Sequence, residues 1–444
     1  MVGVLVATAS GVVFITLVIA ELAGLLQQNP YAGLVVFVAL PAVFVMGLLL
    51  IPVGVRLQRR RLARDPTAVD WPVLDFRRAS VRRTVLLVTA LTAVNVVIIL
   101  LAGYGSLHWM ESPQFCGQVC HKPMHPQFTA WQNASHARVP CVACHIGEGA
   151  KGFVHAKLSG VRQLVHVATD RVPQPIPPGA DMPAGTQAET CRGCHQAERT
   201  LGDRIRVIRE YADDEKSTES ETILQMHLGA ASPSKRAIHW HARPDVRVEY
   251  VAADAERQTI PYVRVTNAGG QVTEYRSPGT RDDLVNIGNR QTMDCIDCHN
   301  TVGHPIAPTP EKAVDQAIAA AVVSRDLPYA RREGVRLVKA DYGDAAAALR
   351  EIDQGLRAFY RSQGASAGEQ AVARTVAAVQ DVYSHNVFPV MKVTFGTYPT
   401  NKGHVTSNGC FRCHDGEHAA PDGKTINADC EYCHTQIERP AGAP

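Results

Sequence analysis

The sequence of 444 residues has no cysteine outside six short motifs, and it has very little net charge. Its 45 basic and 42 acidic side chains leave a formal charge of +3, so the composition gives no indication of nucleic-acid binding. Acidic residues are scarce in positions 1–107, where long apolar runs dominate. The cysteine motifs and the apolar runs therefore carry most of the information.

The twelve cysteines form six pairs, and a histidine directly follows the second cysteine of each pair. Motif 1 is one residue wider than the others and reads Cys116-Gly-Gln-Val-Cys120-His121. Motifs 2 to 6 have the regular spacing and are Cys141/Cys144/His145, Cys191/Cys194/His195, Cys295/Cys298/His299, Cys410/Cys413/His414 and Cys430/Cys433/His434. In a Cys-x-x-Cys-His motif the two thiols bond to the vinyl groups of a c-type haem, and the histidine becomes the proximal iron ligand.

Zinc sites and redox dithiols also use the Cys-x-x-Cys spacing. Neither explains a histidine directly after the second cysteine six times, and a disulfide framework does not need these histidines. The sequence therefore predicts six covalently attached haem c groups. In motif 1 the extra residue must bulge for both thiols to reach one porphyrin, and the count is five if this motif carries no haem.

Three apolar runs of about 20 residues or more predict membrane-spanning helices. They are Val2–Leu26, Leu34–Val55 and Thr84–Leu107. The first lacks the basic start and the cleavage site of a signal peptide, so we expect a retained helix. Nine arginines lie between positions 56 and 83, and the positive-inside rule puts this loop in the cytoplasm. We therefore expect a cytoplasmic N-terminus, with the haem motifs on the periplasmic or otherwise outer side of the membrane.

The predicted fold is a three-helix transmembrane anchor followed by a haem-packed, mainly α/irregular multihaem cytochrome c domain with a small β insert. Five parts are expected: the anchor with its arginine-rich loop (1–107), a part with motifs 1–3 (108–200), an insert with a small β element and motif 4 (201–310), a helical segment (311–384) and a C-terminal part with motifs 5 and 6 (385–444). Alternating residues predict strands within Val246–Tyr275. Helical patterns are expected at Glu198–Glu221, Glu311–Ser324, Asp344–Ser362 and Gln370–Tyr383, and an extended connector at Pro173–Pro183.

The occupant of the sixth iron position decides between electron transfer and substrate chemistry. Twelve histidines remain outside the motifs, and five of them would suffice for haems two to six. The expected set is His136, one of His239 and His241, His304, His404 and His418. Met124 or His125 would complete the first haem. This tally favours low-spin, electron-carrying haems, and it leaves open which ligand pairs with which haem.

The segments FCGQVCHKPMHPQFTAW, SHARVPCVACHIGEGAKGFVHAKLSGVRQL and PIPPG…ETCRGCH resemble the NapC/NirT/NrfH family of membrane-anchored multihaem quinol dehydrogenases. The long, multi-helix form is similar to ImcH-like inner-membrane cytochromes that start extracellular electron transfer in metal-reducing bacteria. The resemblance implies that His136 is a distal ligand, that Met124 lies near the first haem, and that Lys157 lines a quinol pocket. Met124 lies one residue further from its motif than in short members, and Gln163 stands where some members have an acid.

The resemblance also implies a function: a membrane quinol, with menaquinol expected, is oxidised where the third span meets motif 1. Lys157, Glu111, His155 and His108 are candidates for accepting the protons. The expected partners are the quinol pool and a periplasmic redox protein or partner subunit. The alternative is a membrane-tethered electron carrier without a quinone site of its own. A terminal reductase often has lysine in place of a motif histidine, and all six motifs here keep histidine.

Overall fold

The computed structural model describes residues 2–22, 39–64, 75–119, 121–146, 149–178, 187–195, 202–229, 237–285, 290–364 and 368–438. The chain divides into two compact units, Met1–Leu100 and Leu101–Pro444. Each unit has its own packing.

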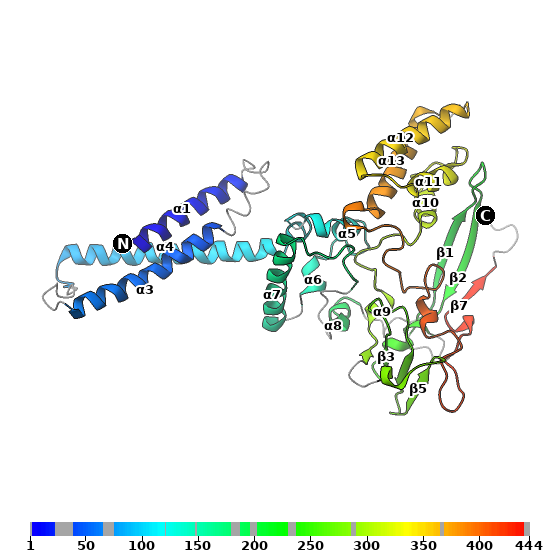
Figure 1. Cartoon of the computed structure of the whole chain (residues 1–444), viewed down its shortest axis with the longest axis horizontal. Coiled ribbons are helices and arrows are strands. Elements are labelled where there is room, and N and C mark those ends of the chain that lie inside the picture. The colour runs from blue at the N-terminus through cyan, green and yellow to red at the C-terminus, as the bar shows by residue number, and fades with distance from the viewer. Residues whose placement is uncertain are drawn as a thin grey trace. The chain divides into compact units, whose positions relative to one another are not determined.

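The first unit is built from long apolar helices (Figure 1). They are α1 Val2–Leu22, α3 Leu40–Arg64 and α4 Ala79–Met110, the last of which continues into the second unit. Small residues allow α1 and α3 to approach closely. A Cβ added to Gly3 would lie 2.7 Å from the carbonyl oxygen of Gly47, and a Cβ added to Gly47 would lie 2.7 Å from the amide nitrogen of Ala7. Such small-residue contacts are typical of helices packed in a membrane.

Helices occupy the positions of all three expected spans, although residues 23–38 lie outside the described part. Within the described residues, Leu40–Leu57 is the segment long and apolar enough to cross a bilayer, and Val6–Leu17 is a shorter apolar helix. One membrane-crossing helix is thus supported, while the anchor of three spans stays a prediction.

The second unit contains ten helices of α or π type within the described residues. They are η2 Phe115–Val119 (a π-helix), α5 His121–Gln132, α6 Cys141–His145, α7 Gly149–Ala168, α8 Gln187–Arg192, α9 Cys295–Cys298, α10 Pro310–Ala319, α11 Ala330–Val338, α12 Ala345–Ser362 and α13 Glu369–Asn386. Short 3-10 helices are η4 Ile238–Ala242, η5 Asp282–Val285, η7 Pro389–Met391, η8 Gly409–Arg412 and η9 Cys430–Tyr432. Its described strands are β1 Arg204–Tyr211, β2 Glu219–Met226, β3 Arg247–Val251, β4 Tyr262–Thr266, β5 Val272–Arg276, β6 Gln291–Thr292 and β7 His434–Ile437.

Helices α10 to α13 form a layer with its own apolar core, as the helical pattern of 311–384 predicts. Ile352 and Leu356 of α12 are completely buried there, together with Val379 of α13. The layer is capped locally, because Thr309 accepts a hydrogen bond from the amide of Lys312 at the start of α10. Helix α11 was not expected from the sequence.

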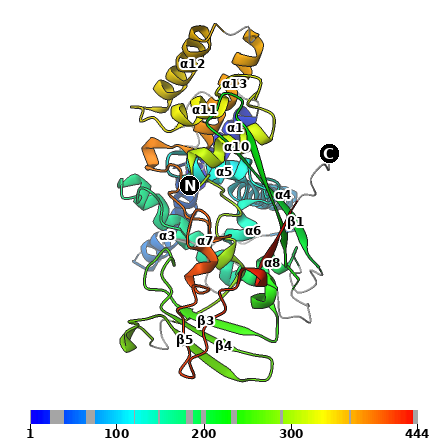
Figure 2. The ribbon, with the colours of Figure 1, turned by 90° about the vertical axis from the view of Figure 1, so that its right-hand side faces the viewer.

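The strands form two antiparallel sheets. The four-stranded sheet has the order β5-β4-β3-β6 and confirms the strands expected within Val246–Tyr275. The three-stranded sheet has the order β1-β2-β7, which joins the hairpin β1–β2 to the chain directly after motif 6. Both views place the four-stranded sheet and the helical layer at opposite ends of the second unit, with the motif helices α6 and α8 between them (Figures 1 and 2).

The helix expected at Glu198–Glu221 is wrong where the structure describes it. Residues Arg204–Tyr211 and Glu219–Met226 are paired strands, with Arg204 opposite Met226 and Tyr211 opposite Glu219. The run Arg-Ile-Arg-Val-Ile-Arg has the two-residue alternation and the β-branched side chains of a strand. Most of β1 is exposed on both faces, including the apolar residues Ile205 (59%) and Val207 (43%).

Candidate functional site

The regular motifs lie on short helical turns. In motifs 3, 4 and 5 the amide of the histidine donates a hydrogen bond to the carbonyl of the first cysteine, over 2.7 Å at His195, 2.8 Å at His299 and 3.0 Å at His414. Residues three apart lie on the same face of such a turn. The two thiols of a motif can therefore reach one porphyrin, with the histidine beside them.

Cys194 of motif 3 lies just beyond the helix that carries its motif. Helix α8 ends at Arg192, so Cys194 lies in the turn that follows, where its amide donates to the carbonyl of Cys191 over 3.2 Å. Cys194 is exposed, as are Cys144 and Cys430, although cysteine is among the most often buried residue types. Their exposure leaves the thiols open to a haem vinyl group, and haem attachment at Cys194 stays a prediction.

The wider motif 1 has a different backbone. Phe115–Val119 forms a π-helix, whose wider turn accommodates an added residue. Gly117 of this turn is buried against the ring of Phe128, and a Cβ at Gly117 would lie only 2.1 Å from that ring. The bulge expected for this motif is confirmed by the backbone, while Cys120 and the side chain of His121 lie outside the described part.

Five motif histidines face a second histidine from elsewhere in the chain, at ring-centroid distances of 5.8 to 6.4 Å. The pairs are His145–His304 (6.0 Å), His195–His136 (5.9 Å), His299–His239 (6.4 Å), His414–His241 (5.8 Å) and His434–His404 (6.1 Å). Two metal–nitrogen bonds of about 2 Å each, added to the radii of two imidazole rings, account for a separation of this size. The residues therefore fit an iron held between each pair of rings.

The distal histidines are oriented by hydrogen bonds at Nδ1. The carbonyl oxygens of Gln127, Leu228 and Ile238 lie 3.0, 2.9 and 2.9 Å from Nδ1 of His304, His239 and His241, respectively. A ring that donates from Nδ1 presents Nε2 as the metal-binding nitrogen. Burial lowers the pKa of His241 to about 4, which keeps the ring in the neutral form that binds a metal.

His136 is held by its surroundings in a similar way. The indole of Trp131 donates hydrogen bonds to the carbonyls of His136 (3.1 Å) and Val139 (2.9 Å) and thus fixes the loop that follows α5. The Oγ atom of Ser135 lies 3.1 Å from Nδ1 of His136. The loop and the ring of His136, which the family resemblance makes a distal ligand, are therefore held in place by hydrogen bonds.

His418 does not fit the expected role. Its ring is buried, with Nδ1 2.9 Å from a carboxylate oxygen of Asp415 and Nε2 2.6 Å from the carbonyl oxygen of Ile260. Both ring nitrogens are thus engaged inside the protein, and His418 serves as a core residue. Five facing histidines are still found, because His239 and His241 each face a motif histidine.

The first haem is described less completely. His125 is exposed and contacts the ring of Phe388 at 5.2 Å, and Met124 is half-buried on the same helix, α5. Neither can be related to His121, since the side chain of His121 lies outside the described part. The choice between Met124 and His125 stays open.

Candidate proton acceptors gather near motif 1. Lys157 on α7 and Glu111 directly after α4 form an ion pair of 3.9 Å, with about a third of each side chain exposed. Lys157 also interacts electrostatically with Cys116 of motif 1. His155 lies on the same helix and is exposed, while His108 stacks on Tyr104 near the end of α4. The structure thus brings Lys157, Glu111 and motif 1 together.

Comparison with known proteins agrees with these features. The profile of the NapC/NirT cytochrome c family, N-terminal region, matches residues 78–175. The cytochrome c-type protein ImcH of Geobacter sulfurreducens is 36% identical over 445 residues, which cover 98% of this chain and 86% of ImcH. The chain belongs to the NapC/NirT cytochrome c family. The cytochrome c-type protein TorY of Haemophilus influenzae is 27% identical over 161 residues, or 32% of this chain and 43% of TorY. No solved structure matches the chain significantly.

Membership in the NapC/NirT family makes the chain a membrane-associated electron-transfer cytochrome with covalently bound haem c. Within this cytochrome, motifs 2 to 5 are neighbours in their order along the chain. Helix α6 of motif 2 contacts α8 of motif 3, and α8 contacts α9 of motif 4. Arg412 of motif 5 donates a hydrogen bond to the carbonyl of Asp297 in motif 4.

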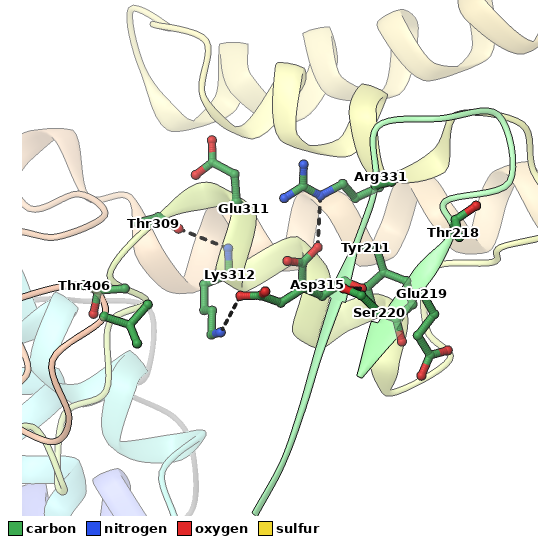
Figure 3. Close-up of a pocket in the computed structure, with 13 residues that line it drawn as sticks. Tyr211, Thr218, Glu219, Ser220, Thr309, Glu311, Lys312, Asp315, Arg331 and Thr406 are labelled. Carbon is green, nitrogen blue, oxygen red and sulfur yellow. Dashed lines mark hydrogen bonds and ion pairs between the residues drawn. The ribbon is translucent and has the colours of Figure 1, made fainter. Parts of the chain in front are cut away.

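A cavity of about 620 Å³ lies between the hairpin β1–β2 and helix α10 (Figure 3). Its basic side chains are paired with acids: Lys312 with Glu210 (3.5 Å) and Arg331 with Asp315 (3.0 Å). None of its 13 lining residues is a cysteine or histidine. The lining thus holds no candidate haem ligand, although Val405 directly follows His404 along the chain.

Proposed function

We propose that this NapC/NirT cytochrome is a quinol dehydrogenase of the bacterial inner membrane. It takes electrons from quinol, with menaquinol expected, and delivers them to a periplasmic redox protein or partner subunit. The observation that carries the proposal is the ion pair between Lys157 and Glu111 beside motif 1, close to the end of the membrane-anchor helix α4. The arginine-rich segment supports a cytoplasmic N-terminus and a haem domain on the periplasmic side.

Six haem c groups would supply a series of one-electron carriers when bound. His145 and His304 would hold haem two, His195 and His136 would hold haem three, and His434 and His404 would hold haem six. The tethered Nδ1 atoms of His136 and His304 fix these two rings, and rings held in this way would disfavour exchange of the iron ligand for a substrate. This favours electron transfer over a reductase reaction.

The residues near motif 1 provide what quinol oxidation needs from the protein. Each quinol hydroxyl must lose a proton, and the Glu111 carboxylate is suited to accept one. The Lys157 ammonium stabilises the oxygen from which the proton leaves. Partial exposure of both side chains leaves them within reach of a substrate, and the exposed His155 and His108 offer routes for protons to water.

The experiment is anaerobic reduction of the purified protein by a menaquinol analogue. We expect Lys157→Met to lower the rate of haem reduction by about 100- to 1000-fold, the usual contribution of one charge-stabilising group. Lys339→Met is a matched control, because Lys339 forms a similar ion pair with Glu311 (3.6 Å) on the distant helical layer. Dithionite should reduce all variants equally.

The alternative function is a membrane-tethered electron carrier that receives electrons from another subunit. It predicts that no quinol reduces the isolated protein, although dithionite does. That result would end the quinol-dehydrogenase proposal and leave the electron-transfer role of the haem series intact.

A further inference from the structure

The 3-10 helix η4, Ile238–Ala242, presents three successive side chains in three directions, because such a helix has three residues per turn. Trp240 points into the apolar cluster that contains Val248 and Tyr250 of β3. His239 and His241 therefore point to two other sides. A single turn can thus hold two ligands for two different metal ions while one aromatic side chain anchors it.

Each histidine of this turn faces a different motif. The ring of His239 lies 6.4 Å from that of His299 in motif 4, with an angle of 26° between the ring planes. The ring of His241 lies 5.8 Å from that of His414 in motif 5, with an angle of 89°. Both separations suit an iron bound between the rings.

Both histidines also have the tautomer that metal binding requires. His239 donates from Nδ1 to the carbonyl of Leu228, and His241 donates from Nδ1 to the carbonyl of Ile238, each over 2.9 Å. These bonds direct the two Nε2 atoms away from the backbone and toward His299 and His414.

Motifs 4 and 5 are themselves fastened together. The buried guanidinium of Arg412, within motif 5, donates to the carbonyl of Asp297, within motif 4, over 2.7 Å, and to the carbonyl of Arg257 over 2.7 Å. The carboxylate of Asp297 is buried and accepts hydrogen bonds from Tyr250 (2.6 Å) and Arg257 (2.7 Å). The two proximal histidines therefore belong to one rigid assembly.

We propose that η4 supplies the distal ligands of two consecutive haems, His239 to the haem of motif 4 and His241 to the haem of motif 5. The inference rests on the haem series of the proposed function, and it is independent of the quinol site. One turn and one buried arginine then fix the fourth and fifth irons relative to each other. Trp240 acts as a positioning residue for both.

The test uses His239→Met, His241→Met and the double variant in the full-length protein, with six haems per chain verified by mass. Methionine raises the potential of a haem that it ligates in place of histidine. In a dithionite redox titration we expect each single variant to shift one component of six upward, and the double variant to shift two. Electron paramagnetic resonance should show the loss of one and two bis-histidine signals, respectively.

His385→Met is the matched control. His385 lies on α13, where its Nδ1 atom is 2.8 Å from the carbonyl oxygen of Asp381, and it stacks on no motif histidine in the described part of the chain, so its replacement should shift nothing. If a methionine variant loses haem, the corresponding alanine variant is examined with added imidazole, which should restore the missing low-spin signal. A double variant that shifts only one component, or a His418 variant that removes a bis-histidine signal, would overturn the inference.

The readouts separate this inference from the proposed function. Dithionite reduces the haems without quinol, so ligand assignments can be made even if quinol fails as a substrate. Conversely, quinol oxidation with unchanged spectra in both histidine variants would retain the proposed function and reject the role of η4.

Discussion

Gly117 is the residue on which the unusual first motif depends. Its α-hydrogen faces the ring of Phe128, and that ring stacks on Trp131 at 5.7 Å, so it has little freedom to move. A methyl group at position 117 would collide with the ring and distort the π-helix. We expect Gly117→Ala to reduce the number of attached haems from six to five, as measured by the mass of the intact protein. The control is Gly160→Ala on α7, where an added Cβ meets no atom within 4 Å; six haems in the Gly117 variant would contradict the expectation.

The haem-attachment motifs could be predicted from the sequence because covalent attachment imposes a fixed spacing of the cysteines and the histidine. The exposure of Cys194 could not be predicted, since the spacing does not show what surrounds a thiol. The distal histidines were only partly readable. From the sequence, only one of His239 and His241 was expected to be a distal ligand. The sequence does not show that a 3-10 turn directs the two side chains to different motifs. His418 was expected to bind iron from its position four residues after His414, but hydrogen bonds to Asp415 and Ile260 occupy both of its ring nitrogens.

The facing elements differ in the angle at which they present their rings. The planes of His434 and His404 lie 22° apart and those of His299 and His239 lie 26° apart, whereas those of His414 and His241 lie 89° apart. When the two axial imidazole planes are nearly parallel, the iron d orbitals that interact with the rings differ in energy. When the planes are nearly perpendicular, these orbitals lie close in energy. We therefore expect the oxidised protein to show both rhombic and strongly anisotropic low-spin signals by electron paramagnetic resonance. A spectrum of one uniform low-spin class would contradict these ring orientations.

A substitution in the core of the helical layer α10–α13 should lower the stability of the protein without changing the iron ligands of the haems. Leu356 is completely buried in its core, and its truncation to alanine should cost about 2–5 kcal/mol. Denaturant unfolding followed by circular dichroism should show a lowered midpoint, while the haem spectrum in the absence of denaturant stays unchanged. Val322→Ala is the control, because this side chain is 53% exposed and its loss should change stability by less than about 0.5 kcal/mol. An unchanged midpoint for Leu356→Ala would argue against this packing.

Elements with a clear period were the predictable part of the fold. The helices α10, α12 and α13 and the strands β3 to β5 lie where their patterns indicate. The hairpin β1–β2 was taken for a helix because charged residues hid its alternation. Its pairing with β7 joins residues about 200 positions apart, a long-range contact that local sequence does not encode.

At the scale of the molecule, motifs 2 to 5 follow one another in space in their chain order. Motif 1 lies closest in sequence to α4, and motif 6 is the last along the chain. This order supports the proposed electron input at motif 1 and output at motif 6. The bulged motif, with Lys157 and Glu111 beside it, is the place where the proposed quinol oxidation would deliver electrons to the haems.

That direction requires the haem domain to lie outside the cytoplasm, which makes membrane topology a decisive test. The nine arginines between positions 56 and 83 should hold this loop in the cytoplasm, since moving them across the bilayer is strongly unfavourable. Alkaline phosphatase fused after Pro444 should be active, and the same enzyme fused after Asp70 should be inactive. The reverse should hold for the fluorescence of green fluorescent protein at these two sites. An active phosphatase after Asp70 would place the arginine loop outside and would contradict the orientation on which quinol oxidation at motif 1 is proposed.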